Sequence, residues 1–129
     1  MSSETLHAPR ERLSQETLQL HFAITSVVEE LEAIDWYRQR ADDAEDEVLK
    51  NLLLHNMREE MEHASMVLEW IRRRNSDFAG HLKTYLFTDA PITGIEKAAE
   101  GNGGESGGST AASTVRTSPV TVGSLKGAR

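Results

Sequence analysis

Two long stretches with a helical pattern, separated by almost nothing, dominate this chain. Residues 14 to about 99 contain few glycines and only one proline, Pro91, so little interrupts a helix there. Apolar residues recur every three or four positions, which predicts one helix over about residues 14–40 and another over about residues 43–74. From the rise per residue of an α-helix, these helices would be roughly 40 and 48 Å long.

Capping residues mark the starts of both helices. Ser14 is a suitable N-cap for the first helix, and Asp42 with Glu45 fits an acidic variant of the capping box at the start of the second. The link around Ala41–Asp42 is then very short. Because short links join neighbouring helices, the sequence predicts an antiparallel hairpin.

Each helix carries one apolar stripe, and a hairpin alone cannot cover both stripes. The first stripe comprises Leu20, Ile24, Val27, Leu31 and Ile34, and the second includes Leu49, Leu53, Val67 and Ile71. Two helices side by side bury one strip each and leave the remaining flank in water. We therefore expect an obligate oligomer in which another chain covers the apolar face.

Shorter and looser segments surround the hairpin. Residues 1–13 should form a flexible N-terminal arm, and residues 77–87 a short helix. Residues 92–100 should add a last turn or two, which completes a helical domain over residues 14–100. The Gly/Ser/Thr-rich residues 101–118 cannot bury enough apolar surface to fold and read as a disordered linker. Apolar residues return in the tail, residues 119–129.

The chain of 129 residues is acidic, with 14 basic and 21 acidic side chains. Residues 1–100 carry 11 basic and 20 acidic groups, whereas residues 101–129 carry three basic and one acidic. Because an acidic body repels phosphate backbones, the charge excludes nucleic acid as a partner. The acidic excess between Glu29 and Glu62 would instead raise the local concentration of cations.

Several classes of protein are excluded by what the sequence lacks. There is no cysteine, which rules out a disulfide framework, a thiolate zinc site, an iron–sulfur cluster and a thiol nucleophile. The longest aliphatic run is Leu52–Leu54, so we expect no transmembrane helix. The first residues lack the apolar core of a secretory signal. These features favour a cytoplasmic protein that does not enter a membrane.

Acidic side chains occupy both helical stripes. On a helical wheel, Glu60 stands at the centre of the second stripe, and His63 lies on its flank one turn further along. A carboxylate in an aliphatic seam is costly unless it is paired, protonated or bound to a metal. On the first helix, Glu30 lies at the edge of the stripe, whereas Glu29 and Glu32 point outward.

This combination of side chains is typical of half a dinuclear metal site. Di-iron and di-manganese carboxylate bundles use one Glu from each of two helices and a Glu-x-x-His from each of the other two. Here Glu30 supplies the single carboxylate, and Glu60 with His63 supplies the Glu-x-x-His. These donors suit Fe(II), Mn(II) or Zn(II). The chain holds one of each element, so a complete site requires two copies.

Four short motifs of the chain read LEAIDWY at 31–37, HN-x-x-EE-x-EHA at 55–64, LEWIRR at 68–73 and TYLFTDAPI at 84–92. Together they resemble encapsulated ferritins, which are half-length ferritin-like proteins housed in encapsulin nanocompartments. The resemblance covers most of residues 14–95. It implies an all-α fold, a two-helix antiparallel hairpin with a short C-terminal helix. It also implies that two chains dimerise into a ferritin-like four-helix bundle and that five dimers form an annular decamer.

The resemblance further implies a ferroxidase, which oxidises Fe(II) to Fe(III) with oxygen at a di-iron centre between two chains. The ligands of that family correspond to Glu30, Glu60 and His63 from both subunits. Its Trp-Tyr pair beside the centre corresponds to Trp36 and Tyr37. From the residues alone, Tyr37 is equally well read as a hydrogen-bond donor that tunes the site or as a packing residue.

An outward site that leads iron to the centre of encapsulated ferritins corresponds to Glu29 and Glu32. Ca²⁺ or another divalent ion would suit this entry site. The annular assembly of the family has no closed mineral cavity, so the resemblance implies that the surrounding shell stores the iron product.

The tail carries a separate motif, VGSLKG at 122–127. This motif resembles the short C-terminal peptide by which cargo docks on the inner wall of an encapsulin shell. The residues expected to bind the shell are Val120, Val122, Gly123, Ser124, Leu125 and Lys126. The flexible linker would give the peptide its reach. The implied location is cytoplasmic, inside the nanocompartment.

Two other functions remain open from the residues. The chain could be a helical interaction module without catalysis, in which polar residues such as Asn56 and Glu60 only set the register of the helices. It could also be a related di-metal carboxylate enzyme that uses peroxide or manganese. Stoichiometric iron binding would argue against the first, and metal analysis with peroxide turnover would identify the second.

Overall fold

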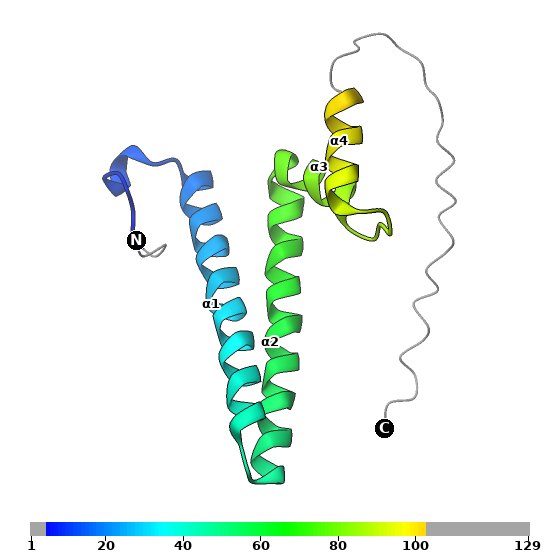
Figure 1. Cartoon of the computed structure of the whole chain (residues 1–129). Helices are drawn as coiled ribbons and strands as arrows, with labels where there is room; N and C mark the ends of the chain where they lie inside the picture. Colours follow the sequence, from blue (N-terminus) through cyan, green and yellow to red (C-terminus); the bar gives the residue numbers. More distant parts are fainter. Residues whose placement is uncertain (1–4, 103–129) are drawn as a thin grey trace, which may run out of the picture.

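The computed structural model describes residues 5–102, and in these residues the regular structure is entirely helical (Figure 1). A 3₁₀ turn at Arg10–Arg12 precedes α1 (Gln15–Asp43), α2 (Glu47–Arg74), α3 (Ser76–Tyr85) and α4 (Ile92–Asn102). The predicted all-α class and the antiparallel hairpin are confirmed. None of the described helices is both long and apolar enough to span a lipid bilayer.

The predicted cap of the first long helix is present, but that of the second is wrong. The Ser14 side chain accepts a hydrogen bond from the Thr17 backbone N–H, with Oγ and N 3.1 Å apart. The second cap is Asp46, whose carboxylate accepts from the Leu49 N–H at 2.8 Å. Asp42, predicted to cap α2 with Glu45, instead lies inside α1.

The position of the link changes with the cap. Ala41, expected in the link, is fully buried within α1. Its packing against α2 favours continuation of the first helix past this residue. Asp42 stays helical one residue later, where its carboxylate lies 3.8 Å from Arg38 one turn earlier. The chain turns at Ala44, Glu45 and Asp46, so α1 ends later and α2 begins later than the sequence suggested.

α1 and α2 run antiparallel and separate gradually from the link toward their far ends (Figure 1). The side chains that the described structure buries are few, and small residues are prominent among them. They are Leu18, Ala23, Ala41, Met57, Ala64 and Ile71. Alanines in the seam allow the two backbones to approach closely. A core of this size is small for two helices of this length.

Much of the apolar stripe stays in water in the single chain. In α1, Ile24 is 42% exposed and Leu31 is 55% exposed, although both belong to the predicted stripe. In α2, Leu49 of the second stripe is 47% exposed. Burial of such side chains is worth about 1.5–3 kcal/mol each, so this surface favours association with another apolar surface.

Asn75 joins the hairpin to its C-terminal part. Its backbone N–H donates to the Ile71 carbonyl at 2.8 Å and so ends α2. Its side-chain oxygen accepts from the Phe78 N–H at 2.8 Å and so begins α3. α3 packs on α2, and α4 packs on α3, whereas α1 contacts neither of these short helices. One residue therefore fixes how the C-terminal part leaves the hairpin.

The short helices differ slightly from their predicted limits. α3 ends at Tyr85, earlier than expected, and the chain then turns through Phe87, which has a positive φ of 60°. α4 extends to Asn102, beyond the expected end at residue 100. The tail predicted to bind an encapsulin shell, residues 119–129, lies outside the described residues.

Candidate metal centre

Three side chains from two helices converge halfway along the hairpin. Glu30 lies on α1, and Glu60 and His63 lie one turn apart on the facing side of α2. His63 Nδ1 is 3.4 Å from a Glu60 carboxylate oxygen and 3.8 Å from Glu30 Oε2. One potential ligand atom from each residue lies within 4.8 Å of the other two. The structure thus brings together the three predicted ligands.

The group is neither buried nor freely solvated. The side chains of Glu60 and Glu30 are 23% and 24% exposed, and that of His63 is 47% exposed. The two carboxylates are therefore largely shielded from water, whereas the imidazole is the most exposed of the three groups. Each of the three side chains keeps enough exposure for a further donor to approach the group from outside the chain.

The two carboxyl groups interact directly. A hydrogen bond with Glu60 raises the pKa of Glu30 above its ordinary value, and burial and the charge of Glu60 act in the same direction. Glu29 adds a smaller effect of the same sign, and the nearby imidazole of His63 opposes it. Like charges at close range favour a shared proton or a bound cation between them. The site is electrostatically prepared for a positive ion.

The donor set restricts which metals fit. Two carboxylates and one imidazole are hard and borderline ligands, which suit Fe(II), Mn(II) and Zn(II) better than the soft ions that thiolates bind. Three protein ligands leave a first-row metal with open positions. Within residues 5–102, no other group of three or more His, Asp and Glu side chains comes close enough to hold a metal.

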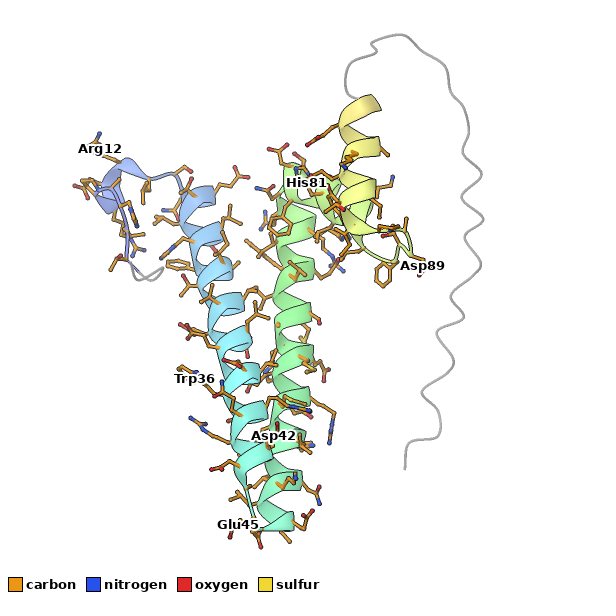
Figure 2. All side chains as sticks on the ribbon, in the orientation of Figure 1. Arg12, Trp36, Asp42, Glu45, His81 and Asp89 are labelled. Atoms are coloured by element: carbon orange, nitrogen blue, oxygen red, sulfur yellow. The ribbon has the colours of Figure 1, made fainter. Side chains whose placement is uncertain are left out.

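The residues predicted to lie beside the centre or at its entry site differ in their exposure, and none of them joins the group of three. Tyr37 is half-buried, and the Arg40 guanidinium lies 5.9 Å from the centre of its ring. Trp36 is 52% exposed and points away from α2 (Figure 2). Glu29 and Glu32 are exposed and do not join the three converging residues. Their proposed roles at an entry site therefore remain predictions.

Two other polar residues of α2 lie near the centre but do not belong to the group of three. His55 lies 3.6 Å from a Glu59 carboxylate oxygen one turn away. Asn56 is half-buried in the seam, one turn before Glu60 on the same face of the helix. Neither residue is among the three side chains that converge.

Comparison with known proteins gives consistent matches. The EncFtn-like family model matches residues 5–89. An encapsulated ferritin-like protein from Rhodospirillum rubrum is 51% identical over an alignment that covers 98% of this chain and 91% of the relative. The encapsulin nanocompartment cargo protein EncC from Myxococcus xanthus is 34% identical over 75% of this chain and 76% of its own length.

A solved structure agrees with the described fold. The crystal structure of a protein from Nitrosomonas europaea superimposes with a TM-score of 0.66 and 52% sequence identity. The match covers 67% of this chain and 96% of the crystallised chain. The described fold therefore recurs, over two thirds of this chain, in a protein of solved structure.

Proposed function

Since this chain belongs to the EncFtn-like family of encapsulated ferritin-like proteins, we propose that it is a ferroxidase. Its substrate is Fe(II), which it oxidises to Fe(III) with oxygen at a di-iron centre formed between two copies. The product is delivered for mineral storage inside an encapsulin shell.

The observation that carries this proposal is the convergence of Glu30, Glu60 and His63 from the two long helices, with all three side chains partly exposed. A second copy placed over this group by a two-fold axis would bring the same three residues. The pair would then offer four carboxylates and two imidazoles, which is the donor set of dinuclear carboxylate bundles. The same contact would cover exposed apolar residues such as Leu31.

The three residues have different tasks in this proposal. Glu60 would be the central carboxylate ligand, because it stands at the centre of the stripe that a second copy would cover. Glu30 is a terminal ligand and must give up a proton to bind, since the hydrogen bond with Glu60 raises its pKa. His63 binds through a neutral imidazole nitrogen. The iron pair supplies the electron transfer to oxygen, and the protein supplies geometry and charge.

In this proposal, Fe(II) reaches the centre along the acidic surface of α1. Glu29 and Glu32 attract Fe(II) from solution, and Ca²⁺ or another divalent ion can occupy the same carboxylates. Trp36 and Tyr37 lie on the same helix, where Tyr37 orients or tunes the centre.

Storage requires the shell. The name of the Myxococcus xanthus relative describes an encapsulin cargo protein, which supports the same partner here. The tail residues Val120, Val122 and Leu125 fill apolar pockets of the shell protein, and the chain works in the cytoplasm inside that compartment. Deletion of residues 119–129 should leave iron oxidation intact and abolish packaging on co-expression with the shell. Normal loading of the truncated chain would contradict this role.

Anaerobic titration with Fe(II), followed by oxygen, tests the catalytic proposal. The parent chain should bind a stoichiometric amount of iron and give a near-ultraviolet ferric signal. Glu60→Gln and His63→Ala should lose both, whereas Glu62→Gln, an exposed carboxylate on the same helix, should behave like the parent. Equal oxidation by all four proteins would overturn the site, and turnover with peroxide or manganese alone would point to another di-metal enzyme.

A further inference from the structure

α3 and α4 pack against each other and leave a groove between them (Figure 1). Two adjoining cavities of about 720 and 430 Å³ share His81, Tyr85 and Glu96 in their walls and together form this groove. None of the three residues of the metal centre lines it. The proposed oxidation of iron therefore leaves the groove without a role.

The charged side chains that line the groove are acidic. Asp77 on α3 and Glu96 and Glu100 on α4 contribute carboxylates, whereas no lysine or arginine is among the described lining residues. His81 is the one side chain among them that can become a cation. Within residues 5–102, none of the three carboxylates takes part in an ion pair. The groove therefore suits a segment with positive charge.

Apolar surface lies beside these carboxylates. Ile92 at the start of α4 is 71% exposed, and it lines the groove together with the half-buried Tyr85. Ala99 adds a small side chain further along α4. The acidic side chains and His81 do not come close enough to one another to form a metal-holding group of three. A metal ion would also leave Ile92 in water, so the surface favours a peptide that carries both apolar and basic residues.

The chain itself contains such a peptide. The residues that follow α4, 103–129, include three basic side chains and one acidic side chain, which are Arg116, Lys126, Arg129 and Glu105. Val122 and Leu125 place apolar side chains close to Lys126. This segment therefore complements the groove both in charge and in apolar character.

The segment is also long enough to return to the groove. α4 has 11 residues and so measures about 16 Å. Glu100 in its last turn lines the groove, so the chain leaves α4 at one end of the binding surface. A Gly/Ser-rich stretch such as residues 103–120 has an expected root-mean-square span of roughly 23 Å, which exceeds the length of α4. Tethering raises the effective concentration of the segment at the groove and so favours it over a separate partner.

We propose that residues 116–127 bind in the α3–α4 groove of their own chain. Leu125 packs on Tyr85 and Ile92, and the basic side chains face the carboxylates. The same tail residues fill the pockets of the shell protein in the proposed function, so the two contacts exclude each other. The groove then covers the apolar tail until the shell protein captures it, a consequence that rests on the proposed packaging.

The absence of cysteine allows a direct test by disulfide formation in the full chain. Gly80→Cys places a thiol in the groove, where an added Cβ meets nothing within 4 Å, and Leu125→Cys places the second thiol in the tail. Oxidation with glutathione disulfide should link the two thiols within one chain. The product is a single chain on a non-reducing gel that has lost both alkylatable thiols.

The matched control replaces Gly80→Cys by Ala98→Cys. Ala98 is exposed, does not line the groove and lies four positions before Asn102, so an unbound tail would reach it at least as readily. The chain with Gly80→Cys should form its disulfide several-fold faster than this control. Equal rates in the two chains, or a disulfide that mainly joins two copies, overturns the proposal.

Charge variants test the recognition separately. Glu96→Gln, added to the chain with Gly80→Cys and Leu125→Cys, should slow disulfide formation by up to about fivefold, which is typical of one exposed ion pair. High salt should slow it in the same direction. Asp89→Asn removes an exposed carboxylate that does not line the groove, and it should leave the rate unchanged. Equal rates for Glu96→Gln and Asp89→Asn would contradict the contact with the carboxylates.

Purified shell protein provides the last comparison. It should slow disulfide formation between Gly80→Cys and Leu125→Cys, because a tail held by the shell cannot occupy the groove. Shell protein that binds the chain but leaves this rate unchanged contradicts the mutual exclusion. Shell protein that does not bind, while the disulfide still forms, overturns the proposed packaging and leaves the groove contact supported. Iron oxidation is tested independently by Glu60→Gln and His63→Ala.

Discussion

Glu30 and His63 lie on different helices, 33 positions apart in the sequence, with a carboxylate oxygen and Nδ1 only 3.8 Å apart. Neither helix alone could place these two groups together. The antiparallel pairing of α1 and α2 does so, and any ion held between them would tie the two helices to each other. Binding of metal and stability of the hairpin should therefore be linked.

Zn²⁺, which has no redox chemistry, should raise the thermal midpoint of the metal-free protein. At a free concentration about 100 times the dissociation constant, the gain is about 2.7 kcal/mol for one site. His63→Ala should lose most of this gain, because even residues that only support a ligand cost about 10–100-fold in affinity when they are removed. Differential scanning calorimetry with and without Zn²⁺ measures the effect.

His55→Ala is the matched control for this measurement. His55 also lies beside a carboxylate on α2, at 3.6 Å from Glu59, but only those two groups meet there. Its variant should keep the full stabilisation by Zn²⁺. Equal loss in both histidine variants would mean that the ion binds elsewhere.

The metal-free protein should lose stability at Glu30 as the pH rises. Because the pKa of Glu30 is higher in the folded chain than its ordinary value, folding takes up a proton there. The contribution of Glu30 is fully favourable below the ordinary carboxyl pKa and disappears as the pH passes through the raised value. The thermal midpoint of the parent relative to Glu30→Gln should therefore fall across this range.

Saturating Zn²⁺ should reverse the order of these two proteins, since the ion replaces the proton and needs the charged carboxylate. Midpoints of parent and Glu30→Gln that run parallel with pH, in the absence of metal, would show that no proton is shared at this position.

Glu69 should titrate far below an ordinary carboxyl group. Hydrogen bonds from Arg72, and then from Arg73, lower the pKa of Glu69 to about 2. Because this pKa is lowered by folding, the contribution of Glu69 is present above its ordinary value and is lost only as the pH falls toward 2. The group is exposed, so the effect on stability should be small.

Carboxyl ¹³C chemical shifts in protein labelled at glutamate measure this titration directly. Arg72→Gln should move the midpoint of Glu69 toward the ordinary value. Arg58→Gln removes a similar charge from the same helix without touching Glu69, and it should leave the midpoint in place.

Asp46→Ala should destabilise the hairpin more than Asp42→Ala. Asp46 satisfies the Leu49 N–H at the start of α2, and loss of such a cap costs about 1 kcal/mol. Asp42 makes only an exposed ion pair with Arg38, which is worth about 0–1 kcal/mol. Urea unfolding of the two variants under identical conditions provides the comparison. A larger loss at Asp42 would restore the link position that the sequence suggested.

The sequence predicts the hairpin and the three converging side chains because both depend on helical periodicity. Glu60 and His63 are one turn apart on one helix, and their place in the stripe can be read from residue spacing alone. Glu30 follows from the same argument on α1. To place Glu30 opposite Glu60 and His63, it was enough to assume that a short link joins the two helices and that they pack antiparallel.

The link itself could not be placed as well. Acidic residues at 42, 43, 45, 46 and 47 are all acceptable near a helix start, so local preference does not choose among them. Burial of Ala41 against α2 makes the choice in favour of Asp46. Because that contact joins two helices, it cannot be predicted from the residues around the link alone.

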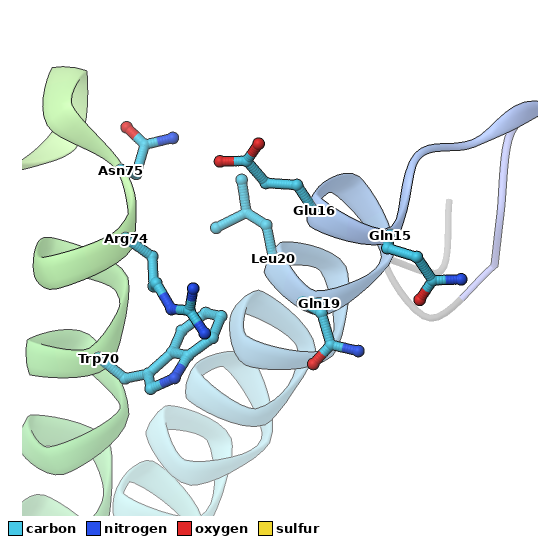
Figure 3. Close-up of a pocket in the computed structure, with 7 residues that line it drawn as sticks. All are labelled: Gln15, Glu16, Gln19, Leu20, Trp70, Arg74 and Asn75. Carbon is cyan, nitrogen blue, oxygen red and sulfur yellow. The ribbon is translucent and has the colours of Figure 1, made fainter.

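The positive φ of Phe87 and the cavity between Leu20 and Trp70 (Figure 3) could also not be predicted from the local sequence. Glycine or asparagine usually occupies a position with positive φ, so a phenylalanine gives no sign of one. Leu20 and Trp70 are 50 positions apart and become neighbours only when the hairpin forms. Both features required the three-dimensional arrangement.

Asn75 serves as cap for two helices at once. The short helices beyond it contact α2 and each other but not α1, so their orientation depends on this residue and on the packing of α3 against α2. Asn75 lies 12 positions after His63, so the hinge of the C-terminal part is separate from the metal-binding group, and a substitution there would redirect the short helices without removing a ligand.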